Sequence, residues 1–490
     1  VTGEEATYTN WAEGEPSNSD GEDYVHMWNF DGTWNDANNE TENEFIIEFA
    51  TPVDKADPVF TNCTFRDNTA KEHGGAIYMG GGSADSQSTP RFVSCTIASN
   101  DVISISDDFL SGYGGGFSSN DNMRPEFVDC QIDSNTVVAG RYSGFGGGGN
   151  INAVSGGAVT TFTRCTFRGN TVTPNQDAFG GGLYAEGEIE LTNCLISENS
   201  SVGGGSDFEG KGGGIYSLLY EDYSSESKII NSTIVDNNAS SAGGSSAGGA
   251  YFEGNNNVTI TMFNNIVWGN TADEYISIYK VDAVILDADY NDIEDYDYSL
   301  GSNSFGYDPL FTAAATGDFS LSDASPLIGA GTSSYGGNSA PANDIISATR
   351  PNPGQSNPDM GAYEYSFAVT GLHYTIENVS AILDWDPIEN FQYYKIERST
   401  DSLFITAVES SFLQDNTYTD NDLEFNTEYF YRVSAFLGYW TDYSNIISVI
   451  LGTVSIVGDN DIPLVYKVHQ NHPNPFNPVT TLRYDLPEDG

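Results

Sequence analysis

The chain has 490 residues, of which 70 are acidic and 17 basic, giving a formal net charge of −53. So acidic a surface argues against nucleic acid or an anionic membrane as a partner, because like charges repel. Divalent cations are its natural counterions, although solubility in a salty medium would explain the acid equally well. A chain of this length is too long to fold around a single hydrophobic core, so we expect several domains.

The first segment, residues 1–50, combines tryptophans with acidic and amide side chains. It carries Trp11, Gly14-Glu15-Pro16-Ser17-Asn18, Glu22-Asp23, Trp34-Asn35-Asp36 and Phe45-Ile46-Ile47-Glu48. This pattern resembles the C-terminal half of a C-type lectin domain. The resemblance implies calcium ligands, which are oxygen atoms of carboxylates and amides, at Glu15, Glu22, Asn35 and Asp36. It implies sugar contacts at Glu15, Ser17, Glu22 and Asn35.

The segment departs from the lectin pattern at two places. Ser17 stands where the sugar-binding loop of that family has Asn, and Tyr24 stands where the family has a cysteine. The first half of such a domain is also missing from this chain. The alternative interpretation is that Trp11, Trp28 and Trp34 are core residues and that the segment binds nothing.

A repeated phrase dominates residues 57–300. A cysteine position recurs at Cys63, Cys95, Cys130, Cys165, Cys194, Ser232 and Asn265, and an asparagine follows five residues later at Asn68, Asn100, Asn135, Asn170, Asn199, Asn237 and Asn270. Neighbouring apolar residues are two apart, which is strand spacing rather than helix spacing. Repeats of 29 to 38 residues then predict coils stacked as a parallel β-helix. Seven coils would span roughly 34 Å at about 4.8 Å per coil.

Two expectations follow for the side chains of these coils. The asparagines should form a ladder of amide hydrogen bonds at a bend, each tolerating a left-handed backbone, and Asn270 should belong to it. The cysteines should be buried free thiols, because equivalent positions on parallel strands lie about 4.8 Å apart and a disulfide needs Cβ atoms about 3.8 Å apart.

Glycine-rich phrases lie between most of the cysteine positions, and they should let the backbone bend and neighbouring coils approach closely. They are Gly74-Gly75-Ala76-Ile77-Tyr78, Gly114-Gly115-Gly116-Phe117, Gly180-Gly181-Gly182-Leu183-Tyr184, Gly212-Gly213-Gly214-Ile215-Tyr216 and Gly248-Gly249-Ala250-Tyr251. The alternation of these phrases with Phe65-x-x-Asn68 resembles the repeats of polymorphic outer-membrane proteins, bacterial surface β-helices associated with adhesion.

The residues after the repeats resemble the closing segment of bacterial β-helix proteins with variable C-terminal anchors. The matching phrases are Asp308-Pro309-Leu310-Phe311, Asp318-Phe319-Ser320-Leu321, Ser325-Pro326-Leu327-Ile328-Gly329-Ala330-Gly331, Arg350-Pro351 and Asp359-Met360-Gly361-Ala362-Tyr363-Glu364. We expect this segment to cap the last coil, which would otherwise expose unpaired strand edges. The β-helix with its cap is thus assigned to residues 57–365.

Residues 366–451 have alternating apolar positions around Trp385, Leu423 and the run Tyr429-Phe430-Tyr431-Arg432-Val433-Ser434-Ala435. They resemble a fibronectin type III sandwich, a module that acts more often as a spacer than as a binding site. The resemblance implies that Trp385 fills the core between the sheets. It also implies that Tyr429 forms the tyrosine corner.

Residues 452–490 complete the chain as a linker followed by His469-Gln470-Asn471-His472-Pro473-Asn474-Pro475-Phe476-Asn477-Pro478 and Thr480-Thr481-Leu482-Arg483-Tyr484-Asp485-Leu486-Pro487. The latter resembles the start of the C-terminal sorting domain of the type IX secretion route of Bacteroidetes-like bacteria. It implies export to the medium or the outer surface of a Gram-negative bacterium, with attachment to the outer membrane through the tail. The sequence contains no run of 18 apolar residues, so it predicts no membrane-spanning helix. Val1 does not begin a signal peptide, so we expect the true N-terminus upstream.

An enzymatic solenoid is the competing interpretation, because β-helices host polysaccharide lyases and glycoside hydrolases. Lyases need a base and a cation, and hydrolases need paired carboxylates. Lys71 and His73 lie close in sequence, whereas Arg66, Arg91, Arg124, Arg141, Arg164, Arg168 and Lys211 are scattered singly. The acidic group Asp287, Asp289, Asp292, Glu294, Asp295 and Asp297 fits either a calcium site or an exposed loop. We select no catalytic residue.

The sequence therefore predicts an all-β protein. A right-handed parallel β-helix is flanked by a partial C-type lectin-like segment and a fibronectin type III sandwich. The predicted function is extracellular binding or adhesion to a polysaccharide or glycoconjugate, with calcium as the cofactor. A polysaccharide lyase or glycoside hydrolase on the β-helix is the alternative, and a surface protein without a ligand is a third.

Overall fold

The structure is a computed structural model that describes most of the chain between residues 58 and 452. The described ranges are 58–80, 88–104, 111–120, 123–153, 159–205, 207–220, 226–240, 246–255, 258–281, 283–296, 300–352, 357–365, 367–388, 391–406, 408–436 and 441–452. Outside them, only backbone is described, in β1 (Tyr24–Met27), β2 (Trp34–Ala37), β48 (Lys467–Val468) and β49 (Tyr484–Asp485). β1 pairs antiparallel with β2, and β48 with β49.

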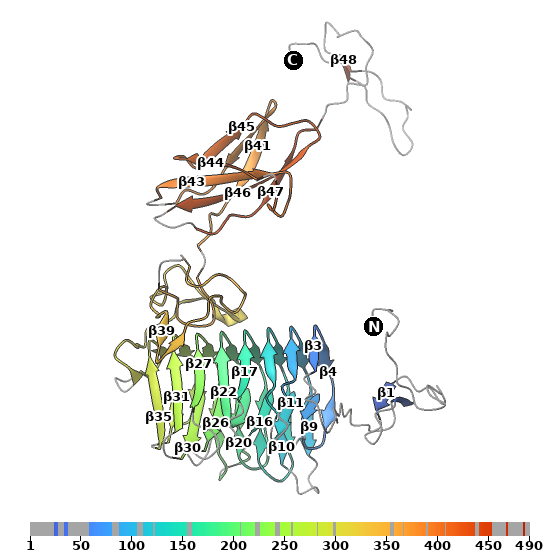
Figure 1. The fold of residues 1–490 in the computed structure, drawn as a ribbon, viewed down its shortest axis with the longest axis vertical. Coiled ribbons are helices and arrows are strands. Elements are labelled where there is room, and N and C mark those ends of the chain that lie inside the picture. The colour runs from blue at the N-terminus through green and yellow to red at the C-terminus, as the bar shows by residue number, and fades with distance from the viewer. Residues whose placement is uncertain are drawn as a thin grey trace. The chain divides into compact units, whose positions relative to one another are not determined.

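Two compact units divide the chain, Val1–Phe367 and Ala368–Gly490. The first unit contains a parallel β-solenoid, drawn from blue to yellow in Figure 1. All its long sheets are parallel, and the described residues contain no α-helix. The prediction of an all-β chain built on a parallel β-helix is confirmed.

Two of the solenoid sheets have eight strands each. The first contains β3 (Val59–Thr61), β7 (Arg91–Val93), β12 (Glu126–Val128), β17 (Val159–Thr163), β22 (Glu188–Thr192), β27 (Glu226–Ile230), β31 (Val258–Phe263) and β35 (Val284–Asp289). The second contains β4 (Thr64–Arg66), β8 (Thr96–Ala98), β13 (Gln131–Asp133), β18 (Thr166–Arg168), β23 (Leu195–Ser197), β28 (Thr233–Val235), β32 (Ile266–Trp268) and β36 (Asp292–Ile293). The structure thus adds an eighth coil to the seven expected.

Two further sheets have seven strands each and a fifth has four. The third contains β5 (Thr69–Ala70), β9 (Asp101–Ser104), β14 (Thr136–Ala139), β19 (Thr171–Val172), β24 (Ser200–Val202), β29 (Asn238–Ser240) and β33 (Thr271–Ala272). The fourth contains β6 (Ile77–Met79), β11 (Phe117–Asn120), β16 (Gly149–Asn152), β21 (Leu183–Glu186), β26 (Ile215–Leu219), β30 (Ala250–Gly254) and β34 (Ile278–Lys280). The fifth contains β10 (Gly112–Tyr113), β15 (Gly144–Phe145), β20 (Ala178–Phe179) and β25 (Gly210–Lys211).

The asparagine ladder is present over its full predicted length. Each side-chain amide donates to the next asparagine's Oδ1 at 2.9 Å, from Asn68 through to Asn270. One detail of the prediction was wrong, because the left-handed residue is the one before each asparagine. These preceding residues are Asp67, Ser99, Ser134, Gly169, Glu198, Asp236 and Gly269, with φ between 54° and 65°. The asparagine itself is thereby left free to point its amide into the turn.

The cysteine column lies inside the solenoid as free thiols, as predicted. Cys95, Cys130, Cys165 and Cys194 are buried, and Cys63, on the first coil, is partly exposed. Toward the last coils the column becomes a second polar ladder. The main-chain N–H of Ser232 donates to Asn265 Oδ1 at 2.8 Å, and the Asn265 amide donates to Asn291 Oδ1 at 2.9 Å.

The glycine phrases act at the corner between the fifth and fourth sheets. Gly74, Gly114, Gly146, Gly180 and Gly212 have φ between 57° and 67°, a left-handed conformation that glycine adopts without strain. The next glycine permits close approach, since a Cβ on Gly147 would lie 2.3 Å from the carbonyl oxygen of Gly181. Both predicted roles of these glycines are confirmed.

Residues 303–365, here called the flanking segment, do more than close the last coil. Phe305 pairs with that coil, donating to the Asn291 carbonyl at 2.9 Å and accepting from Ile293 at 2.8 Å. The rest lies along one flank of the solenoid, at the top of the coils in Figure 1. Its elements are β37 (Phe311–Ala313), the 3₁₀ helix η2 (Ala314–Thr316), β38 (Asp318–Leu321), β39 (Ser334–Tyr335) and β40 (Asn338–Ser339).

The flanking segment covers the outer face of the second sheet where that face is apolar. Phe319 packs against Leu195 and Val235, and Leu327 packs against Ile266. The equivalent outward positions on the first four coils are polar, at Thr64, Thr96, Gln131 and Thr166. The flanking segment therefore packs on the coils where it removes apolar surface from water.

A buried ionic group holds the flanking segment together. Arg350 Nε lies 2.9 Å from Glu364 Oε2, and both side chains are fully buried. Asp344 and Asp359 are also fully buried, and Asp359 accepts main-chain hydrogen bonds from Gly329 and Tyr365. Burial raises the pKa of Glu364 to about 7 and that of Asp359 to about 6.

The second unit contains an antiparallel sandwich of two sheets. One sheet contains β41 (His373–Glu377), β42 (Ser380–Asp384) and β45 (Thr417–Asp420), and the other contains β44 (Glu409–Leu413), β43 (Tyr393–Ser399), β46 (Glu428–Phe436) and β47 (Ile447–Ile450). This strand order gives the unit fibronectin type III-like features, and Trp385 is buried in its core as predicted. Tyr429 is buried beside Arg398, and its assignment to the tyrosine corner stays a prediction. A second tyrosine of the same strand, Tyr431, donates from its hydroxyl to Asp420 Oδ2 at 2.7 Å.

Candidate functional site

Tyrosines form a column on the outer face of the fourth solenoid sheet. Alternate residues of a strand point to opposite faces, so Leu183 and Ile215 enter the core while Tyr184 and Tyr216 point outward. The rings of Tyr184, Tyr216, Tyr251 and Tyr279 follow one another with centroid separations of 5.3, 5.4 and 4.9 Å. We call these four residues the tyrosine column.

A second aromatic column lies across the glycine corner, on the fifth sheet. His73, Tyr113, Phe145 and Phe179 stack with centroid separations of 4.7, 5.0 and 5.1 Å. The two columns touch, because the Phe145 ring meets Tyr184 edge-on at 5.0 Å. We call the two columns and the polar side chains along their edge the aromatic corner. It exists because the glycine turn places the outward residues on its two sides against each other.

Lys211 occupies the position after Phe179 in the second column. Its ammonium lies 5.1 Å from the centroid of Tyr251 and 5.9 Å from that of Phe179, within the range of cation–π attraction. It also lies 2.6 Å from a carboxylate oxygen of Glu209. Within the aromatic corner, the Lys211 ammonium therefore interacts with one carboxylate and two aromatic rings.

Two glutamates and several phenol groups meet along the edge of the tyrosine column. Tyr216 donates to Glu253 Oε2 at 2.6 Å, and Tyr184 donates to Glu186 Oε2 at 3.4 Å. The Tyr220 hydroxyl also hydrogen-bonds Glu186. Burial raises the pKa of Glu186 above its ordinary value and strongly raises the pKa of Tyr216. The phenols therefore remain protonated donors at neutral pH.

The lectin-like candidate residues fall mostly outside the described part of the chain. Glu15, Ser17 and Glu22 lie there, whereas Asn35 and Asp36 belong to β2, whose backbone alone is described. In that strand Asn35 pairs with His26 and Asp36 with Val25. Calcium and sugar binding by these residues stays a prediction.

The acidic group near the last coil attaches the flanking segment instead of forming an exposed loop. Asp287 accepts from the Tyr335 hydroxyl at 2.6 Å, Asp289 accepts from the Asn303 amide at 2.8 Å, and Asp292 accepts from the Tyr307 N–H at 2.8 Å. Asp292 is fully buried, which raises its pKa to about 7. Asp297 lies outside the described residues. In the part of the chain that the structure describes, no three His, Cys, Asp or Glu side chains are grouped to hold a metal ion.

Several of the scattered basic residues of the solenoid face acids. Arg91 lies 3.0 Å from Glu126, Arg164 lies 2.6 Å from Asp129, and Arg168 lies 2.8 Å from Glu198. Lys71 and His73 are on the first coil, where His73 stacks on Tyr113. Arg91, Arg164 and Arg168 are thus each paired with one acid of a neighbouring coil.

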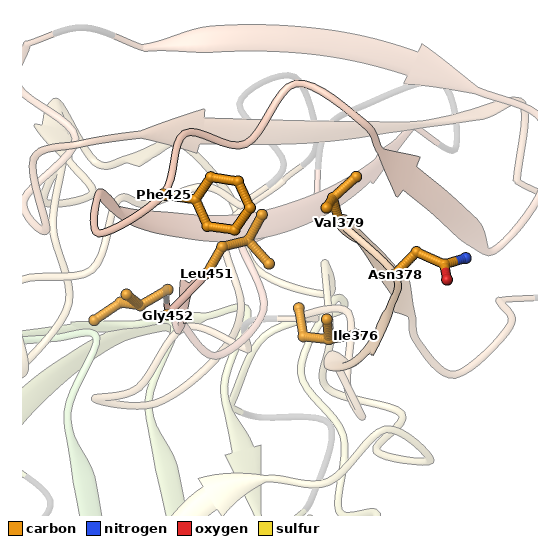
Figure 2. A pocket seen from close by; sticks show the side chains of 7 residues that line it. Ile376, Asn378, Val379, Phe425, Leu451 and Gly452 are labelled. Atoms are coloured by element: carbon orange, nitrogen blue, oxygen red, sulfur yellow. The ribbon is translucent and has the colours of Figure 1, made fainter. Parts of the chain in front are cut away.

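An apolar pocket of about 470 Å³ lies in the sandwich unit. Figure 2 shows Ile376, Val379, Phe425 and Leu451 around it, with Gly452 at its edge. Asn378 contributes the polar side chain among its lining residues. This pocket has no acid, base or nucleophile in its lining, so we assign no chemistry to it.

The aromatic corner was not predicted from the sequence, although a signal for it was present. Four of the quoted glycine phrases end in tyrosine, at Tyr78, Tyr184, Tyr216 and Tyr251. The phrases were interpreted through their glycines alone, and no role was predicted for the recurring tyrosine. Which residues lie opposite that tyrosine depends on the bend of the glycine turn, and only the structure supplies the bend.

No protein-family model matches this chain, and no curated protein matches it either. Among solved structures, the chain is similar to an Fn3-like protein from Clostridium thermocellum, at 25% identity over 18% of this chain and 94% of that one, with a TM-score of 0.16. It is also similar to the sixth fibronectin type III domain of human fibronectin type III domain containing protein 3, at 15% identity over 20% of this chain and 95% of that one, with a TM-score of 0.17. A third similar structure contains the FN1–FN3 domains of chicken CNTN1, at 18% identity over 19% of this chain and 35% of that one, with a TM-score of 0.17.

These similarities each cover a fifth of the chain or less, and their TM-scores carry no argument about the fold. The topology of the chain therefore defines the class of the protein. It is a modular all-β protein that joins a parallel β-solenoid to a fibronectin type III-like sandwich. No helix in the described ranges is both long enough and apolar enough to cross a membrane.

Proposed function

We propose that this chain is a secreted or surface-displayed binding protein that recognises extracellular glycans through the aromatic corner. The observation that carries the proposal is the meeting of Glu186, Glu253 and Lys211 with stacked tyrosines on one outward edge of the solenoid. Carboxylates, phenols and amides are the groups that pair with sugar hydroxyls. Aromatic rings supply apolar surface beside a few well-placed polar groups, which is the usual composition of a ligand site.

The modular architecture is compatible with this proposal. A stacked solenoid contacts a ligand along its length, because each coil repeats the same outward positions. The sandwich adds a separate unit without catalytic groups in its pocket. Export by the type IX route, which the tail resemblance implies, would place both units where extracellular glycans occur.

The test is affinity electrophoresis through gels that contain neutral, anionic or cationic polysaccharides. The double variant Glu186→Gln with Glu253→Gln should migrate as if no polysaccharide were present, while the wild-type protein is retarded. Glu190→Gln is the matched control, because Glu190 is a partly exposed glutamate of the neighbouring sheet. Equal retardation of all three proteins would contradict the assignment to the aromatic corner.

A calcium arm tests the lectin-like segment separately. Retardation that is abolished by a chelator, and by Glu22→Gln but not by the Glu186/Glu253 double variant, would assign binding to Glu15, Ser17, Glu22, Asn35 and Asp36. Retardation that the chelator leaves unchanged assigns binding to the solenoid. Calcium is thus a proposed cofactor of the first fifty residues.

Glycoside hydrolysis at the same place is the second candidate, because two carboxylates lie at equivalent positions two coils apart. Glu186 and Glu253 share a register through Leu218. Inverting glycosidases use two carboxyl groups on opposite sides of the scissile bond, one of them an acid of raised pKa. Glu186, whose pKa burial raises, would be that acid. Shortened polysaccharide chains after incubation with wild-type protein, but not with Glu186→Gln, would replace binding by hydrolysis as the main function.

A further inference from the structure

The line of outward tyrosines in the fourth sheet is broken at two consecutive coils. The equivalent positions along it are Tyr78, Ser118, Asn150, Tyr184, Tyr216, Tyr251 and Tyr279. Small polar side chains replace rings at Ser118 and Asn150. We call these two residues, with Tyr78 and Asn120, the polar break.

The rings on the two sides of the polar break differ in what their faces touch. Tyr184, Tyr216 and Tyr251 stack on one another and are only 4–6% exposed, so their faces are already in contact with rings. Tyr78 has no ring at the next position of its line and is 44% exposed. It is therefore the one of these four that can stack on a ligand.

Amide and hydroxyl groups surround the free ring. The Asn120 amide donates to the Tyr78 hydroxyl at 3.3 Å, and the Asn150 amide donates to Ser118 Oγ at 3.1 Å. The other column forms the adjoining wall, with the His73 ring 5.3 Å from Tyr78. One side of the polar break is thus aromatic and its floor is polar.

Two acceptors in the polar break have no partner among the residues that the structure describes. Asn150 is 1% exposed, and neither its Oδ1 nor Asn120 Oδ1 accepts a hydrogen bond from the described part of the chain. A buried carbonyl oxygen without a donor destabilises the fold. On the next coils the equivalent position holds Tyr184 and then Tyr216, whose rings stack on each other. A donor from outside the protein would satisfy both oxygens.

The charges at this end of the aromatic corner select the class of ligand. The side chains of Ser118, Asn120 and Asn150 carry no charge. Burial lowers the pKa of His73, which keeps the imidazole neutral there despite Glu72 at 3.5 Å. The carboxylates Glu186 and Glu253 lie on later coils of the same corner and would repel an anionic chain.

We propose that the polar break is a subsite for a neutral sugar unit, whose apolar face stacks on Tyr78 and whose hydroxyl groups donate to Asn120 and Asn150. This assignment rests on the proposed glycan-binding function and names the substrate class of its site. Neutral polysaccharide chains are the ligands, with the polar break contacting one unit and the partly exposed edge at Glu186 and Glu253 contacting the units that follow.

The test is isothermal titration of the full chain with hexasaccharides. The probes are cellohexaose, mannohexaose, xylohexaose and N-acetylchitohexaose as neutral chains, hexagalacturonate as the anionic chain and a deacetylated chitohexaose as the cationic one. At least one neutral probe should bind, and Tyr78→Ala and Asn120→Ala should each weaken it by about tenfold, the equivalent of about 1.4 kcal/mol. Tyr307→Ala is the matched control, because Tyr307 is a 58% exposed tyrosine outside the aromatic corner; it should leave the affinity within twofold.

Each other outcome has a distinct meaning. Binding of a neutral probe that Tyr78→Ala and Asn120→Ala leave unchanged overturns the subsite and leaves glycan binding in place. Binding of only the anionic or only the cationic probe overturns the substrate class. Failure of all six probes, together with unretarded migration in every polysaccharide gel, overturns the proposed function and the subsite with it. Circular dichroism of both variants, which change exposed or partly exposed side chains, separates loss of binding from loss of fold.

Discussion

Replacing Asn170 by alanine removes a fully bonded side chain from the interior of the asparagine ladder. Its Oδ1 accepts from the main-chain N–H and the side-chain amide of Asn135, both at 2.9 Å. Its own amide donates to the Ile132 carbonyl at 2.8 Å and to Asn199 Oδ1 at 2.9 Å. The variant therefore loses four hydrogen bonds at a position with no solvent exposure.

The expected cost follows from the groups that the variant leaves unpaired. Asn199 Oδ1 keeps the bond from the main-chain N–H of residue 170, but the main-chain N–H of Asn135 and one hydrogen of its amide lose their partner inside the solenoid. At about 1–3 kcal/mol for each unsatisfied buried group, Asn170→Ala should lower the free energy of unfolding by about 3–5 kcal/mol.

Asn68→Ala is the matched control at the partly exposed end of the ladder. The Asn68 side chain donates only to Asn100 Oδ1, which keeps a second bond from the Asn68 main chain. This loss should cost about 0.5–1.5 kcal/mol, as for one ordinary hydrogen bond.

Thiol labelling provides an assay specific to the solenoid, because all five cysteines of the chain lie in it. The urea concentration at which the four buried thiols become reactive should fall clearly further for Asn170→Ala than for Asn68→Ala. Equal midpoints for the two variants would refute the reasoning, since the ladder would then contribute no more inside the solenoid than at its end.

Three further predictions concern buried polar groups. Burial raises the pKa of Asp292 to about 7, so the folded state holds this proton more tightly than the unfolded chain does. The protonated carboxyl therefore adds to the free energy of unfolding at pH 4, and this contribution is lost as the pH rises through 7. The urea midpoint measured by circular dichroism should thus fall between pH 5 and 8, and fall less in Asp292→Asn; a larger fall in the variant would contradict this. Arg350→Met leaves buried carboxylates without their cation, which should destabilise the flanking segment by about 3–5 kcal/mol and speed its proteolysis; unchanged proteolysis would count against it. Tyr431→Phe removes the hydroxyl bond to Asp420 and should lower the stability of the sandwich by about 1–3 kcal/mol, whereas Tyr429→Phe, which keeps that bond, should not.

The repeat could be predicted because its physics is local. Apolar residues two apart specify strands, and a polar residue recurring at one position of every coil specifies a ladder. The same logic failed for the eighth coil, because Asn291 follows Asn265 after only 26 residues and without a cysteine phrase before it. It failed again for the left-handed residue, since sequence alone does not separate the asparagine from its neighbour.

The candidate site could not be predicted in the same way. Tyr184 and Phe179 lie on different strands, and their contact depends on the bend at Gly180. Tyr216 and Glu253 are 37 residues apart, and the lengths of the loops between coils do not reveal that they meet. The acidic group at Asp287 and Asp289 looked like a cation site because its partners, Tyr335 and Asn303, come later in the chain.

Sequence patterns were enough to predict the parallel coils, the asparagine ladder, the buried thiols and the sandwich core around Trp385. Each of these depends on residues within one coil or one strand pattern, and stacking similar coils brings equivalent positions together without further information. The aromatic corner, the polar break at Ser118 and Asn150, and the path of the flanking segment became visible in the folded chain alone. Those features arise where different elements meet, and the angle of a glycine turn and the burial of an apolar sheet face fix which residues meet there.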